Sequence, residues 1–148
     1  MKQEKSAGCI VYYYDKKPFF LVLKNTLKNT YWGFPKGKIE DNEKPEETAI
    51  RETKEEVNLD VSLIPGFDYL QKWFYKKDDE LIKKESVFFL TEIDKKDKDK
   101  VKINFENEDF KFLSLDSALE LMKIKNNKEM LIEAERFIKE YNKQKKLF

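Results

Sequence analysis

Three glutamates, Glu52, Glu55 and Glu56, are the residues of this sequence best suited to carry out chemistry. If their segment is helical, steps of about 100° place Glu56 about 40° to one side of Glu52 and Glu55 about 60° to the other. Three carboxylates on one such arc repel one another unless a positive charge lies between them. Mg²⁺ is the natural counter-ion, since it takes hard oxygen ligands and retains waters and substrate phosphates. On spacing alone, a charged, solvent-exposed helix face is an equal alternative.

Arginine is rare in this chain, because only Arg51 and Arg136 occur among 30 basic residues. Arg51 adjoins the glutamates, and its rigid fork of donors can fix the conformation of one carboxylate. No role is assigned to Arg136.

The helix that carries these glutamates is predicted over residues 45–57. Pro45 suits the first helical position, and Glu46 and Glu47 suit the first turn. Asn58 suits the left-handed position that closes a helix. Small and apolar residues predicted to pack on a sheet occupy the other face: Ala49, Ile50, Thr53 and Val57.

The surrounding chain predicts an α/β (α+β) fold, with a mixed sheet between helices. Alternating and β-branched patterns predict strands, and charge or amphipathic patterns predict a loop and two helices. The predicted strands are 7–14, 18–24, a short strand within 31–39, a hairpin of 67–76 and 86–93, and 110–113. A solvated loop is predicted at 95–100, and helices at 116–122 and 127–143. The last helix has a core-facing stripe of Met130, Ala134, Phe137, Ile138 and Tyr141.

The bulk composition narrows the function further. The 148 residues fit one domain, residues 1–148, and a net charge of +1 argues against binding to duplex DNA or a membrane surface. The chain has no histidine, which excludes imidazole bases and histidine-ligated zinc. Cys9, the single cysteine, is predicted to be a core residue. We therefore expect a cytoplasmic protein that is a monomer or weak homodimer.

The segment from Gly37 to Leu59 resembles the Nudix box, G-x5-E-x7-R-E-U-x-E-E-x-G-U, where U is a bulky apolar residue. Two positions depart from this pattern: Thr53 stands at an aliphatic position, and Asn58 replaces the last glycine. Asn tolerates the left-handed conformation that glycine supplies. The positions that match are Gly37, Glu43, Arg51, Glu52, Glu55, Glu56 and Leu59. The resemblance implies a Nudix-type α/β/α sandwich and makes the charged-face alternative a minor one.

The resemblance also implies roles for the matched residues. Glu52, Glu55 and Glu56 would bind Mg²⁺, for which Mn²⁺ can substitute, together with the backbone carbonyl of Gly37. Glu43 and Arg51 would support these ligands. The metal would bridge phosphates, stabilise the leaving group and activate water.

Outside the box, the chain is similar to the asymmetric diadenosine tetraphosphate (Ap4A) hydrolases of the animal and archaeal type. The likeness includes Ser6-Ala7-Gly8, residues 32–37 (WGFPKG) and residues 106–113 (ENEDFKFL). It implies that Glu106 is the general base or an additional metal ligand, with Glu108 as the nearby alternative.

Aromatic and basic residues are candidates for binding the substrate, a small nucleotide. Hydrolases of this group carry a tyrosine some sixteen residues after the box, where Tyr75 stands here. Trp73 or Tyr75 could stack on adenine, although their strand face could equally be core. Four lysines are candidates for meeting the phosphates, with Lys36 the strongest because it lies inside the matched loop: Lys36, Lys38, Lys83 and Lys84.

The sequence thus predicts an enzyme that cleaves Ap4A asymmetrically to ATP and AMP. A pyrophosphatase of oxidised dNTPs and a 5′-RNA pyrophosphohydrolase are alternatives within the family, although RNA usually requires a basic groove. A Nudix module that only binds nucleotides or a protein partner is the alternative from another class. Such modules typically lose box carboxylates, and none is lost here.

Overall fold

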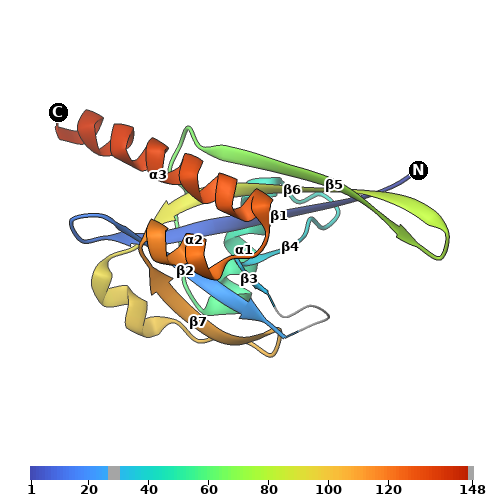
Figure 1. Cartoon of the computed structure of the whole chain (residues 1–148), viewed down its shortest axis with the longest axis horizontal. Coiled ribbons are helices and arrows are strands. Elements are labelled where there is room, and N and C mark those ends of the chain that lie inside the picture. The colour runs from blue at the N-terminus through green and yellow to red at the C-terminus, as the bar shows by residue number, and fades with distance from the viewer. Residues whose placement is uncertain (27–30, 147–148) are drawn as a thin grey trace.

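The computed structural model describes residues 1–26 and 31–146, whose strands form one mixed sheet with helices on both faces (Figure 1). The strand order is β3-β2-β1-β6-β5, with β4 paired to β1 and β7 paired to β2. This confirms the predicted α/β/α arrangement. The elements are β1 (Lys2–Tyr14), β2 (Pro18–Asn25), β3 (Trp32–Gly33), β4 (Lys36–Lys38), α1 (Pro45–Val57), β5 (Asp68–Lys77), β6 (Glu80–Glu92), the 3₁₀ helix η1 (Lys95–Lys100), β7 (Asn107–Leu113), α2 (Leu115–Leu121) and α3 (Lys125–Lys146).

Strand β1 is the centre of the sheet. It pairs in parallel with β6, from Lys2 opposite Ile82 to Tyr12 opposite Glu92, and antiparallel with β2 and β4. Its residues from Ala7 to Tyr13 are buried on both faces, as is usual for a strand with helices on either side.

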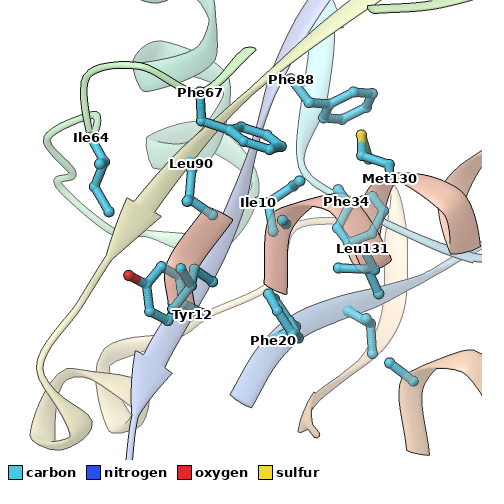
Figure 2. Packing of buried hydrophobic residues seen from close by; sticks show 14 of the residues in the cluster. Ile10, Tyr12, Phe20, Phe34, Ile64, Phe67, Phe88, Leu90, Met130 and Leu131 are labelled. Carbon is cyan, nitrogen blue, oxygen red and sulfur yellow. The ribbon is translucent and has the colours of Figure 1, made fainter. Parts of the chain in front are cut away.

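Two apolar cores flank this strand. The first contains Ile10 and Tyr12 of β1 together with Met130, Leu131 and residues of α2 and α3 (Figure 2). The second contains the alternate residues of β1 with Ala49 and Val57 of α1. In Figure 1, α2 and α3 lie in front of the sheet and α1 lies behind it. Of the stripe predicted on α3, the residues fully buried are Met130, Ala134 and Ile138.

Most predicted elements are confirmed, and α1 has both predicted ends. Strand β1 begins at Lys2, five residues before its prediction, because the polar residues there pair with β6. The prediction of a loop at 95–100 was wrong, since these residues form η1. The amide of Asp97 donates to the carbonyl of Asp94 at 2.9 Å, which tightens the segment into a 3₁₀ turn.

Two core predictions had different outcomes. Ile50 was predicted to pack on the sheet, but it is 37% exposed, and Glu56 is buried in α1 instead. At about 100° per residue, Glu56 lies only about 20° from Ala49, at the edge of the buried face. Cys9 is fully buried as predicted, and burial raises the pKa of its thiol to about 11. In the described part of the chain, no helix is both long and apolar enough to cross a bilayer.

Candidate active site

Glu56 is the most buried of the three helix glutamates, with 5% of its surface exposed. Its carboxylate accepts the backbone N–H of Lys36 at 2.7 Å and the side-chain amide of Asn107 at 3.2 Å. Burial raises its pKa to about 8, although these two hydrogen bonds oppose the shift; the nearby Glu106 and Glu52 add to it. A carboxylate with this environment is a candidate functional group.

The end of α1 brings residues 102–107 to Glu56. A helix leaves its last carbonyls without partners inside the helix. Here the amide of Lys102 donates to the carbonyl of Val57 at 3.1 Å, and that of Asn104 donates to Glu56 at 3.2 Å. Asn58 closes the helix in the left-handed conformation, with φ of 64°, which confirms its predicted role. These bonds hold Glu106 and Asn107 beside the helix.

Arg51 connects the remaining box acids. Its Nε and Nη2 donate to the two oxygens of Glu43, and its Nη1 donates to Glu52 at 3.0 Å and Glu55 at 3.3 Å. Nη2 also donates to the carbonyl of Lys38 at 3.1 Å, which ties the helix to β4. The hydrogen bonds from Arg51 lower the pKa of Glu43 to about 2.

Glu52 packs directly on Gly37. A Cβ atom built at Gly37 would lie 2.1 Å from the carboxyl carbon of Glu52, so only glycine fits there. Burial and the neighbouring Glu55 raise the pKa of Glu52, while Arg51 lowers it. The glycine that opens the box therefore provides the space that its first helix glutamate occupies.

A cleft of about 630 Å³ begins at Glu56 and Glu106 and extends over the sheet past Lys36, Trp73 and Lys84. The Nζ atoms of Lys36 and Lys84 lie 5.2 and 5.6 Å from the centre of the Trp73 ring. Burial and the charge of Lys84 lower the pKa of Lys36 to about 8, while Glu56 opposes this. One end of the cleft is therefore acidic and the next stretch is cationic.

Other predicted residues lie at the edge of this arrangement. Glu55 has a side chain that is 54% exposed. Tyr75 is not among the described residues that line the cleft, but its hydroxyl donates to Glu4, which does line it. Lys38 lines the cleft as well. The two candidates paired elsewhere are Glu108, 3.0 Å from Lys24, and Lys83, 3.0 Å from Glu85.

Sequence reasoning missed three buried amides in the cleft: Asn107, Gln71 and Asn127. Gln71 Nε2 donates to Asn127 Oδ1 at 3.0 Å and contacts the sulfur of Met130 at 3.7 Å. Since sulfur accepts but cannot donate here, this fixes the Gln71 amide with its oxygen free. Asn107 follows Glu106 directly, so its position in the similar segment was an available signal. The Gln71–Asn127 pair had no local signal.

The donor set suits a hard divalent cation, since it consists of carboxylate oxygens that destabilise one another's charge. As they stand, no three acidic side chains within residues 1–26 and 31–146 form a group that could hold a metal ion. Arg51 hydrogen-bonds to Glu52 and Glu55, and Glu56 accepts two hydrogen bonds from the protein. Mg²⁺ binding by these residues stays a prediction.

Comparison with known proteins agrees with this geometry. The NUDIX domain profile matches residues 2–134, and the chain therefore belongs to the Nudix hydrolase family. The chain is 32% identical over 124 residues to the asymmetrical bis(5'-nucleosyl)-tetraphosphatase of Sus scrofa, covering 80% of each protein. It is 29% identical over 140 residues to the dihydroneopterin triphosphate diphosphatase of Haemophilus influenzae, covering 88% of this chain and 86% of that one. The fold resembles a C. elegans Ap4A hydrolase structure with a TM-score of 0.79 and 24% identity, covering 91% and 97% of the chains.

Proposed function

We propose that this chain is a Mg²⁺-dependent hydrolase that cleaves Ap4A asymmetrically to ATP and AMP. The observation that carries the proposal is the cleft that joins the acidic end, at Glu56 and Glu106, to the cationic stretch at Lys36 and Lys84. A polyphosphate needs metal ligands at the reacting phosphate and cations along the rest of the chain. The similarity to the Sus scrofa enzyme supports the choice of substrate.

The reaction consumes one water. Its oxygen forms a bond to an outer phosphorus of Ap4A, the bond from that phosphorus to the bridging oxygen breaks, and ATP leaves with that oxygen. When bound at Glu52, Glu55, Glu56 and the Gly37 carbonyl, Mg²⁺ supplies charge neutralisation and water activation. Glu106 lies outside the helix. It either accepts the proton of the attacking water or serves as a further ligand to the metal. Arg51 and Glu43 orient the helix glutamates.

The cationic stretch binds the remaining phosphates in this proposal. Lys36 is half-buried and Lys84 lies opposite Trp73 on the paired strand, and both ammonium groups lie near the indole ring. Trp73 thus serves chiefly to position two lysines, and this role competes with stacking on adenine.

The buried amides give the base a polar contact. Among the described residues, Gln71 Oε1 and Asn127 Nδ2 have no hydrogen-bond partner, and both residues line the cleft. One free acceptor beside one free donor matches the amino group and N1 of adenine. The rings of Tyr31, Phe34 and Phe88 line the same cleft and would give the base an apolar surface.

The test is a turnover assay with Mg²⁺ and Ap4A, with products separated by anion exchange. The comparison substrates are 8-oxo-dGTP, ADP-ribose, a 5′-triphosphate RNA and dihydroneopterin triphosphate. The last is included because the Haemophilus influenzae relative is a dihydroneopterin triphosphate diphosphatase. ATP plus AMP as sole products, with the highest kcat/KM of the panel, supports the proposal. A preference for another substrate keeps the chemistry and rejects Ap4A. No turnover in folded, metal-loaded protein favours a binding module.

A further inference from the structure

A second cavity of about 350 Å³ adjoins the cleft. It lies along the polar first half of β1, between β4 and the far end of the β5–β6 hairpin. The two cavities share Glu4, Lys5 and Lys38, so they lie next to each other along β1. The residues found only in the second cavity are Lys2, Gln3, Ile39, Lys77 and Ile82.

The second cavity is strongly basic. Four lysines line it against one carboxylate, that of Glu4, which accepts the hydroxyl of Tyr75: Lys2, Lys5, Lys38 and Lys77. Its described lining contains no aromatic ring, and Ile39 and Ile82 are its apolar residues. Such a surface attracts anionic groups but offers no platform for stacking a base.

The cavity is also placed in line with the reaction site. Gly37, which packs on Glu52, is the residue between Lys36 of the cleft and Lys38, which belongs to both cavities. The amide of Ile39 donates to the carbonyl of Lys5 at 3.0 Å, which fixes this edge against β1. Charge therefore changes from acidic at Glu56 to cationic at Lys36 and Lys84 and stays cationic into the second cavity.

We propose that the second cavity is a subsite for the distal phosphates of an oligophosphate whose nearer phosphates lie at Lys36 and Lys84. This inference rests on the proposed function and adds a selection by length: chains of four or more phosphates reach the subsite, and chains of two do not. It assigns Lys2 and Lys77 as residues that determine substrate length.

The test compares binding of ADP and adenosine 5′-tetraphosphate by isothermal titration calorimetry without divalent metal. The variant Lys2→Ala/Lys77→Ala is expected to weaken binding of the tetraphosphate about tenfold, the scale of one lost charge-assisted contact, and to change ADP binding less than about twofold. The control is Lys72→Ala/Lys76→Ala, which removes the same charge from positions of β5 that line neither cavity. It should leave both ligands unaffected.

Equal weakening of both ligands, or equal effects of the two double variants, would overturn the inference in favour of a general electrostatic field. Unchanged tetraphosphate binding in Lys2→Ala/Lys77→Ala would overturn it directly. Weakened binding of a 5′-triphosphate RNA oligonucleotide with unchanged tetraphosphate binding would assign the cavity to an RNA backbone instead. Near-UV circular dichroism checks folding. Because binding is measured without turnover, failure to cleave Ap4A rejects the proposed function separately.

Discussion

Arg51 donates a hydrogen bond to each carboxylate oxygen of Glu43, from Nε at 2.7 Å and from Nη2 at 3.0 Å. This pair joins the loop before α1 to the middle of the helix. The remaining nitrogen of the guanidinium contacts Glu52 and Glu55, so one side chain sets the positions of three acids. A lysine, with a single nitrogen, cannot make this set of contacts.

Replacing Arg51 by lysine is therefore expected to keep the charge and lose the positioning. We expect kcat to fall about 10–100-fold, the range typical of residues that orient metal ligands. Arg136→Lys is the matched control, since Arg136 is exposed on α3 and pairs with Glu133. Steady-state kinetics of both variants check the prediction. Equal activity of the two would contradict the positioning role.

The Arg51–Glu43 ion pair also predicts how the stability of the fold depends on pH. The pKa of Glu43 is lowered from 4.5 to about 2, so its ionised form is favoured in the folded state. Its contribution is fully present above pH 4.5 and disappears as the pH falls through about 2. The difference in free energy of unfolding between the wild type and Glu43→Gln should shrink over this range in urea titrations. Glu108→Gln, which breaks an exposed pair with Lys24, should show little difference at any pH. A constant difference for Glu43→Gln would contradict the prediction.

Glu56→Gln is expected to abolish turnover and leave the fold intact. The two side chains have the same shape, and the glutamine oxygen can still accept one of the two hydrogen bonds from Lys36 and Asn107. We expect kcat to fall by more than about 100-fold, beyond the effect of a merely supporting residue. Glu46→Gln, at an exposed site in the first turn of α1, is the control. Thermal denaturation checks that the variant is folded, and Mn²⁺ titration measures its metal binding. A folded Glu56→Gln protein with near-normal activity would reject the metal site.

Ser86 offers a test of stability away from the reaction. It is fully buried in β6, and its hydroxyl has no hydrogen-bond partner in the described part of the chain. Removing an unsatisfied buried hydroxyl should stabilise the fold, so Ser86→Ala should raise the free energy of unfolding by about 1 kcal/mol. Ser114→Ala should lower it by about 1 kcal/mol, because Ser114 caps α2 through the amide of Ser117. Urea denaturation of both variants measures the direction in which each free energy of unfolding changes. A destabilised Ser86→Ala protein would mean that the hydroxyl is satisfied by a group such as water.

Local signals in the sequence were sufficient to predict α1 and the acids it carries. Pro45 and Asn58 mark its two ends, and the spacing of the glutamates follows from helical geometry. The β5–β6 hairpin was predicted for a similar reason, since its turn at Asp78 and Asp79 separates two aromatic and aliphatic runs. Its second strand, β6, begins at Glu80, six residues before the predicted start at residue 86.

Contacts between distant residues could not be predicted in this way. Asn107 is 51 positions from Glu56, and Asn127 is 56 positions from Gln71. No periodic pattern relates such pairs, because the sheet and the packing of α3 bring them together. The burial of Glu56 was visible in part, since a helical projection places it beside Ala49. Glu56 was considered only as a metal ligand, so its position at the edge of the core was not predicted.

The parallel pairing of β1 and β6 has a consequence for how the protein is made. Each pair in this ladder joins residues 80 positions apart, from Lys2–Ile82 to Tyr12–Glu92. During synthesis, each residue of β1 must therefore wait for 80 further residues before its partner in β6 is made. Closing such long loops costs entropy before any contact compensates for it, which slows folding. The acids of α1 are synthesised about 50 residues before Glu106 and Asn107, so the candidate active site assembles only after these later residues have been made.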